Sequence, residues 1–275
     1  MTELQKFATQ IRLAELKCLK TRGFGHLGGS LSMTDLLAAL YGKIMKYDPK
    51  NPQWAERDRL VISKGHAGPA AYATLALKGF FPMEWLDTLN QPHTNLPSHC
   101  DMTKTPGSDM STGSLGQGAS TAVGLAMGLK YHKSNAHVYA VVGDGESNEG
   151  QVWEAALFAP AHKLNNLMTF VDYNKKQLDG RTDEVAPLGD IAKKYAEFGW
   201  YAVNVENGND PDAIAAAIED AWKHNGDKPV AMILHTVKGC GVPSIEEIEY
   251  NHHINFGGEL ADKAIAELEG RLANA

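Results

Sequence analysis

The sequence has 275 residues, of which 43% are apolar and 21% are charged, and its formal net charge is −7. This length suits one α/β domain with a large core, and the acidic balance argues against a nucleic-acid partner. The apolar runs are much shorter than the roughly 20 residues of a membrane span, and the first ten residues lack a signal-peptide core. The three cysteines have no CxxC spacing, which indicates a reducing cytoplasm.

The N-terminal third is predicted to alternate regular elements with glycine-rich turns. The predicted elements are helices over 4–21, 36–45 and 70–77 and a strand over 58–63. Ser32-Met33-Thr34-Asp35 is similar to a capping box and predicts the start of the second helix. His26 and His66 each lie in one of the glycine turns. A single histidine among glycines is more often an ordinary loop residue than a catalytic one, so the residue pattern alone favours no role for them.

The middle of the chain contains a short helix over 82–90 and a long loop over 91–113. A loop of this length inside a compact domain is more often functional than not. Two histidines lie in it, of which His99 is the candidate site residue and His93 is interpreted as an ordinary loop residue. The loop leads into a helix of small residues over 118–127, and helix N-termini favour anions.

The central segment predicts a strand, a crossover helix and a second strand. Apolar runs cover 138–142 and 167–171, and one side of the helix between them is formed by Val152, Ala155, Ala156 and Ala159. Such a unit is right-handed and parallel, so both strands end at the same sheet edge. Asp144 follows the first strand and Asn174 the second, so both side chains are expected in one crevice. One carboxylate and one amide oxygen suit Mg²⁺, which completes its shell with water and phosphate.

The remaining elements complete the predicted fold. They are helices over 188–198, 212–222 and 259–275 and strands over 201–205 and 230–236. Asp210 is expected to cap the 212–222 helix, with Pro211 at its first position. Alternating strands and helices predict a doubly wound α/β fold, with a mostly parallel sheet and helices on both faces.

Several motifs resemble those of one known family. Gly143-Asp144-Gly145 with Asn174 about thirty residues later is similar to the thiamine diphosphate motif, and the wording of 143–155 resembles transketolase. More narrowly, it resembles the N-terminal subunit of split, two-chain transketolases. The likeness extends over nearly the whole chain through GHLGGSLSMTD, SKGHAGPA, STGSLGQG and TVKGCGV.

The resemblance implies a diphosphate-type thiamine diphosphate-binding module and a set of site residues. The implied cofactors are thiamine diphosphate and Mg²⁺, for which Ca²⁺ or Mn²⁺ can substitute. The implied catalytic residues are His26, His66, His99 and His252, with His253 as the alternative to the last. The implied cofactor-binding residues are His66, Gly113, Ser114, Leu115, Gly143, Asp144, Gly145, Glu149 and Asn174. The implied metal ligands are Asp144, Asn174 and the backbone carbonyl of Lys176, a position that is usually aliphatic in the family.

The same resemblance implies a transferase that moves a two-carbon ketol unit from a ketose phosphate, or a related anionic ketose, to an aldose. Residues 1–275 would form a single thiamine diphosphate-binding domain. The pyrimidine-binding and C-terminal domains would lie on a partner subunit in an α2β2 assembly, without nucleic acid or membrane. Alternatives are an α-type subunit of a 2-oxoacid dehydrogenase and a non-catalytic cofactor-binding paralogue. The ketose remains open among pentose phosphates, branched sugars and sulfonated sugars.

Overall fold

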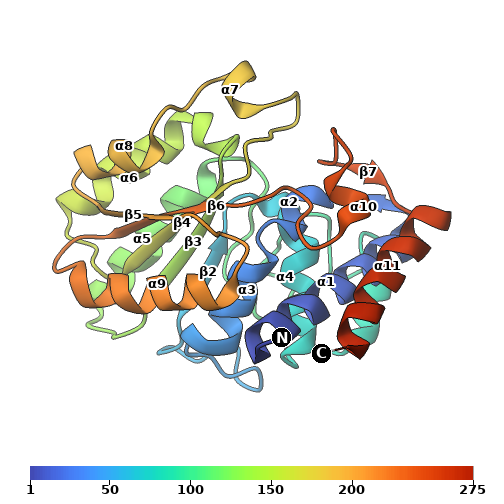
Figure 1. The fold of residues 1–275 in the computed structure, drawn as a ribbon. Helices are drawn as coiled ribbons and strands as arrows, with labels where there is room; N and C mark the ends of the chain where they lie inside the picture. The colour runs from blue at the N-terminus through green and yellow to red at the C-terminus, as the bar shows by residue number, and fades with distance from the viewer. Residues whose placement is uncertain (275) are drawn as a thin grey trace.

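The centre of the computed structural model, which describes residues 1–274, is a five-stranded sheet (Figure 1). Its strands run in the order β2, β3, β4, β6 and β5, and every neighbouring pair is parallel. The strands are β2 (Arg59–Ile62), β3 (Val138–Gly143), β4 (Leu167–Tyr173), β5 (Tyr201–Val205) and β6 (Val230–His235). The predicted strands therefore agree with the structure within two residues at each end.

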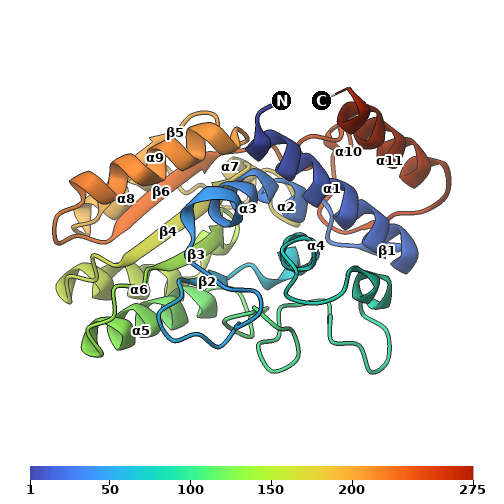
Figure 2. The same cartoon turned by 90° about the horizontal axis from the view of Figure 1, so that it is seen from below.

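Helices cover both faces of this sheet, which confirms the doubly wound α/β fold (Figures 1 and 2). One face carries α5 (Gln117–Tyr131), α6 (Gly150–Ala161) and α8 (Ile191–Glu197). The other side carries α1 (Glu3–Arg22), α3 (Thr34–Ala39), α4 (Gly68–Leu77) and α9 (Pro211–His224), and α11 (Gly258–Ala273) packs against α1 away from the sheet. Helix α1 packs against α3, α4 and α11, and it therefore holds the helices of this side together.

The strands are nearly continuous apolar runs because both of their faces are buried. In β4, Met168 and Phe170 belong to the core under α1, α3 and α9, whereas Leu167 and Val171 belong to the core under α5 and α6. Successive side chains of a strand point to opposite faces, so one strand contributes to two hydrophobic cores. This arrangement leaves the carboxyl ends of the strands as the sheet's polar edge.

The remaining elements are short. They are β1 (Phe24–Gly25), β7 (Ile254–Asn255), α2 (Gly28–Leu31), α7 (Thr182–Val185) and α10 (Pro243–Glu246), with 3₁₀ turns at Gly65–Ala67, Met83–Thr88 and Glu146–Asn148. β1 and β7 pair antiparallel, with Phe24 opposite Asn255 and Gly25 opposite Ile254. The pairing places the N-terminal glycine turn beside the segment that carries His252 and His253.

The helix ends confirm one predicted cap and correct another. Asp210 caps α9 by accepting from the backbone N–H groups of Asp212 and Ala213. The capping box at Ser32 is wrong, because α3 begins only at Thr34 and the Ser32 hydroxyl donates to a carboxylate oxygen of Asp172 at 2.6 Å. The helix predicted over 36–45 is accordingly α3 followed by a π-helical turn at Leu40–Ile44.

The predicted C-terminal helix is α11, and its expected last residue, Ala275, lies outside the described residues. Across residues 1–274, none of the helices combines the length and the apolar character needed to cross a membrane.

Candidate active site

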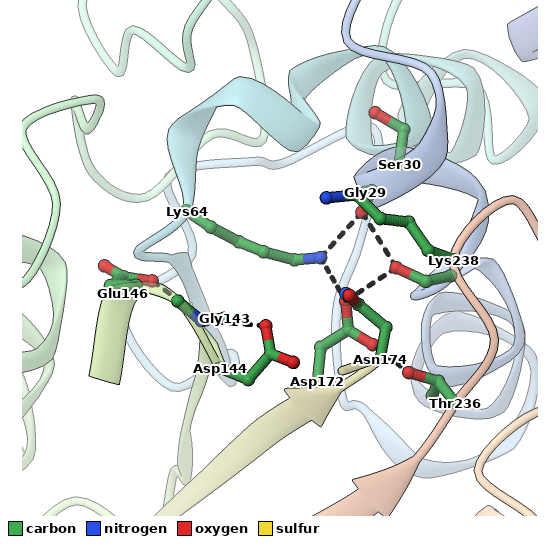
Figure 3. Close-up of polar contacts among 12 residues, drawn as sticks. Gly29, Ser30, Lys64, Gly143, Asp144, Glu146, Asp172, Asn174, Thr236 and Lys238 are labelled. Atoms are coloured by element: carbon green, nitrogen blue, oxygen red, sulfur yellow. Dashed lines mark hydrogen bonds and ion pairs between the residues drawn. The ribbon is translucent and has the colours of Figure 1, made fainter. Parts of the chain in front are cut away.

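The carboxyl ends of β3 and β4 open into one crevice, as the sequence predicts. The two strands are in register, with Gly143 opposite Asp172. The backbone N–H of Asp144 donates to the carbonyl of Asp172 at 3.2 Å, and Asn174 follows at the end of β4. Figure 3 shows Asp144 and Asn174 facing the same space.

Asp144 is a buried carboxylate held by neutral donors. One oxygen accepts from the N–H of Gly145 at 2.8 Å, and the other accepts from the N–H of Lys175 at 2.6 Å and from the Thr182 hydroxyl at 3.2 Å. Burial, followed by the nearby charge of Asp172, raises the pKa of Asp144 to about 6, although these hydrogen bonds act in the opposite direction. A bound cation would stabilise the ionised form of this group.

The predicted metal ligands offer three oxygen atoms of the kind that Mg²⁺ prefers. The side-chain oxygen of Asn174 accepts from the N–H of Lys176 at 3.1 Å, while its amide nitrogen donates to Asp172 at 3.0 Å. The carbonyl of Lys176 accepts from Nζ of Lys238 at 2.9 Å. An acidic carboxylate, an amide oxygen and a carbonyl that already accepts from a cation therefore fit a divalent ion, with Asp144 as its charged ligand.

Asp172 is the centre of the polar contacts in the crevice, and the sequence did not identify it (Figure 3). This carboxylate is fully buried and accepts from the side chains of Ser32, Lys64, Asn174 and Thr236. Burial raises its pKa, but the Lys64 ammonium and the hydroxyl donors outweigh burial, so the net pKa of Asp172 lies below its ordinary value. Because Asn174 donates its N–H to Asp172, its amide oxygen is directed away from that carboxylate.

Lys64 connects this centre to two histidine turns. Its buried ammonium forms an ion pair with Asp172 and also donates to the carbonyl of Gly29 at 2.6 Å. Gly29 lies three residues after His26, and Lys64 lies two residues before His66. The same ammonium therefore fixes the relative position of both histidine-bearing turns.

Glu146 is a second buried carboxylate that sequence reasoning missed. Its side chain accepts from the Ser63 hydroxyl, from the N–H of Gly116 at 2.8 Å and from the N–H of Gly143 at 2.9 Å. Burial raises its pKa, against the effect of these donors. Glu146 thereby joins the Gly-Asp-Gly turn to the N-terminus of α5. Glu149, the predicted cofactor-binding carboxylate, is instead exposed beside Gly116 at the start of α6, and its role stays a prediction.

The loop Gly113-Ser114-Leu115 lies between His99 and the Gly-Asp-Gly turn. Gly113 has a φ of +143°, and a Cβ there would lie 3.1 Å from the ring of His99. A Cβ on Gly65 would lie 2.7 Å from the N–H nitrogen of Gly113. Positions 113 and 65 therefore exclude side chains. The side chain of Ser114, in the same loop, is exposed.

The structure brings the four predicted histidines together. The ring centroid of His26 lies 5.3 Å from that of His66, 5.7 Å from His99 and 5.4 Å from His252, and His66 lies 4.8 Å from His252. His253 also belongs to the group, 4.7 Å from His26, but it is exposed where His252 is half-buried. His93, interpreted as a loop residue, is exposed in the long loop.

The pKa values of His26, His66, His99 and His252, which together form the histidine wall of the site, are all lowered. Burial and neighbouring imidazoles lower the pKa of His26 to about 4, and burial with the charge of Lys238 lowers that of His252 to about 3. Burial also lowers the pKa values of His66 and His99. A neutral imidazole has one N–H donor and one acceptor nitrogen, so this wall can bind hydroxyl groups and exchange protons with them.

Lys238 is a further site residue that the sequence did not single out. Its buried ammonium lies 3.1 Å from Nδ1 of His252, in addition to its contact with the Lys176 carbonyl. Burial and the charge of Lys64 lower its pKa to about 8, although Asp144 acts in the opposite direction. This side chain joins the predicted metal ligands to the histidine wall.

This is an α/β fold with a parallel sheet, and Gly-Asp-Gly and Asn lie at the ends of adjacent strands. The combination defines a thiamine diphosphate-binding domain. Residues 4–274 match the family model described as "Transketolase, thiamine diphosphate binding domain". The chain belongs to this family.

Named relatives and solved structures agree with this assignment. The chain is 50% identical over 267 residues to the 6-deoxy-6-sulfo-D-fructose transketolase subunit of Clostridium sp. (strain MSTE9), covering 97% of this chain and 96% of the relative. It is 37% identical to an apulose-4-phosphate transketolase subunit of Phocaeicola vulgatus, covering 98% and 94%. It also superimposes on the transketolase of Campylobacter jejuni with a TM-score of 0.90 and 31% identity, covering 98% of this chain and 43% of that one.

The buried ion pair between Asp172 and Lys64 leads to a prediction about the free energy of unfolding. Replacing Asp172 with Asn leaves an ammonium buried without its carboxylate, so we expect a loss of about 3–5 kcal/mol in the free energy of unfolding. Lys64→Met is expected to cost a similar amount. The double variant should lose less than the sum, because the second change removes the unpaired charge left by the first. Urea denaturation measures all three.

The exposed pair of Lys43 and Glu219 is the control, because its two side chains are 49% and 45% exposed and their removal should have little effect. The pKa of Asp172 lies below its ordinary value, so its contribution to stability is present above about pH 4 and decreases as the pH falls through the folded-state value. Strictly additive losses from Asp172→Asn and Lys64→Met would contradict the pairing.

Proposed function

We propose that this chain is the thiamine diphosphate-binding subunit of a two-chain transketolase whose ketose donor is 6-deoxy-6-sulfo-D-fructose. The observation that carries the proposal is the 50% identity to a subunit named for that donor, over nearly the full length of both chains. The identity to the apulose-4-phosphate transketolase relative is lower, at 37%. The reaction moves carbons 1 and 2 of the ketose to an aldose and leaves a four-carbon sulfonated aldose.

Mg²⁺ would be held by the carboxylate of Asp144, the amide oxygen of Asn174 and the carbonyl of Lys176. The metal would in turn bind the diphosphate, near the loop Gly113–Leu115 and the N-terminus of α5, where the helix favours an anion. Thiamine diphosphate, when bound, supplies the nucleophilic carbon and the electron sink for transfer of the two-carbon unit. Ca²⁺ or Mn²⁺ offers the same preference for oxygen ligands.

The histidine wall would orient the sugar and move its protons. His26, His66, His99 and His252 come from four separate turns, and their ring spacings are short enough for neighbouring imidazoles to contact one substrate. Each neutral imidazole can accept a proton from one hydroxyl and donate to another. Their lowered pKa values support this role, because an imidazolium would have no acceptor nitrogen.

The remaining parts of the enzyme would lie on a partner subunit. The chain matches 96% of a relative named as a subunit but only 43% of the longer transketolase chain of C. jejuni. Residues 1–275 would accordingly be one thiamine diphosphate-binding domain, and the pyrimidine-binding and C-terminal domains would belong to the partner in an α2β2 assembly. The free cysteines Cys18, Cys100 and Cys240 are consistent with a cytoplasmic location.

The alternative functions have less support. The family assignment gives no support to a 2-oxoacid dehydrogenase α-type subunit. A non-catalytic paralogue would have no need of the four converging histidines, whereas this chain places all of them in one group.

The proposed reaction is testable with the purified chain and a candidate C-terminal transketolase subunit from the same organism. The assay contains thiamine diphosphate, Mg²⁺, 6-deoxy-6-sulfo-D-fructose and glyceraldehyde 3-phosphate, and mass spectrometry detects the four-carbon sulfonated aldose and the five-carbon ketose phosphate. We expect both products from the two subunits together and neither from this chain alone. Fructose 6-phosphate is the matched donor without the sulfonate.

Equal rates with fructose 6-phosphate and the sulfonated ketose would contradict the donor assignment. Turnover by this chain alone would contradict the two-chain assembly.

His252 and His253 provide a test of the histidine wall. His252 is half-buried against His66, whereas His253 is exposed, so His252→Ala should lower kcat/KM by about 10²–10⁴-fold. His253→Ala should lower it by only a few-fold, and His93→Ala in the exposed loop should leave it unchanged. Cofactor affinity, measured by calorimetry, should remain in all three because the metal ligands are intact. A large loss in His253→Ala with none in His252→Ala would reverse the assignment.

A further inference from the structure

Lys238 is a buried cation between the predicted metal ligands and the histidine wall. It follows β6, and its residue is 4% exposed. Its Nζ donates to the carbonyl of Lys176 at 2.9 Å and lies 3.1 Å from Nδ1 of His252. Figure 3 shows Lys238 and Lys64 reaching toward the crevice from opposite sides. The two lysines differ in their partners, since Lys64 is paired with Asp172.

The carbonyl that accepts from Lys238 is one of the oxygens predicted to hold the metal. Asp144, the charged ligand of the same set, attracts the Lys238 ammonium, and so does Asp172. The ammonium thus offsets the negative charge of these two carboxylates. A charge buried without such compensation would be costly.

We propose that Lys238 is a resident counter-cation of the metal site, and that a divalent ion binds by displacing its ammonium from the carbonyl of Lys176. The released ammonium remains beside His252, where it can bind the anionic cofactor. This inference rests on the proposed function, because it assumes that Asp144, Asn174 and Lys176 hold the metal.

The charge of Lys238 should affect binding of the divalent ion and binding of the diphosphate in opposite directions. A divalent ion on Asp144 and the Lys176 carbonyl is repelled by an ammonium that contacts the same carbonyl, and such repulsion is strong in a poorly solvated site. A diphosphate carries negative charge and is attracted by the same ammonium. Removing the charge should therefore strengthen binding of the metal alone and weaken binding of the diphosphate. A residue that only supported the fold would weaken both when it is replaced.

The experiment compares the full chain with Lys238→Met and measures Mn²⁺ binding by electron paramagnetic resonance at neutral pH. Without cofactor, Mn²⁺ should bind Lys238→Met at least about tenfold more tightly than the wild type. With saturating Mn²⁺, calorimetry should show thiamine diphosphate binding weakened by about tenfold in the same variant. Lys193→Met removes an exposed lysine of α8 and should change neither affinity. Lys238→Gln is a second neutral variant that keeps a hydrogen-bond donor, and it should shift both affinities in the same directions.

Unchanged or weaker Mn²⁺ binding in both neutral variants, with the wild type binding the cofactor, would overturn the role of Lys238 alone. If the wild-type chain binds thiamine diphosphate equally well with and without Mn²⁺, the proposed metal-dependent function itself is wrong. The Mn²⁺ measurement without cofactor still decides on the counter-cation in that case.

Discussion

The geometry of the candidate site depends on the neutralisation of one buried carboxylate. Asp172 is fully buried at the end of β4, where an unpaired charge would be strongly destabilising. Lys64 and Thr236 supply an ion pair and a hydroxyl donor from the turns after β2 and β6, and Ser32 supplies a second hydroxyl from the turn between α2 and α3. Satisfying this charge therefore brings together the turn with His66, the turn with His26 and the segment with Lys238. Because Asn174 donates to the same carboxylate, one interaction also orients a predicted metal ligand.

Much of the fold and part of the site are predictable from the sequence because they depend on local patterns. The apolar runs of β3 and β4 are long enough to identify as buried strands, and their parallel connection places Asp144 and Asn174 at one edge. The burial of Val152, Ala155 and Ala159 in α6 follows from helical periodicity alone. The convergence of His26, His66, His99 and His252 was predicted from a resemblance, because no local pattern indicates that β1 pairs with β7.

Sequence reasoning missed the residues whose roles depend on partners distant in the chain. In the sequence, Asp172 and Glu146 were indistinguishable from ordinary polar residues near strand ends. Their burial becomes clear only when the fold places Lys64 beside Asp172 and Ser63 beside Glu146. Ser32 misled for the same reason, since its hydroxyl fits a helix cap locally but bonds to Asp172 in the fold. A lysine directly before a histidine turn, as in the Lys64-Gly65-His66 segment, was the available signal. This pattern does not specify the partner of the lysine.

The central claim is that the crevice between β3 and β4 binds thiamine diphosphate through a divalent ion on Asp144. Calorimetric titration of thiamine diphosphate into the chain, with and without Mg²⁺, tests it most directly in the wild type and in Asp144→Ala. The account predicts Mg²⁺-dependent binding in the wild type and an affinity lower by more than about 100-fold in the variant. Asp183→Ala, which removes an exposed carboxylate of α7, should bind as the wild type does. Equal, Mg²⁺-dependent affinity in the wild type and in Asp144→Ala would contradict the account.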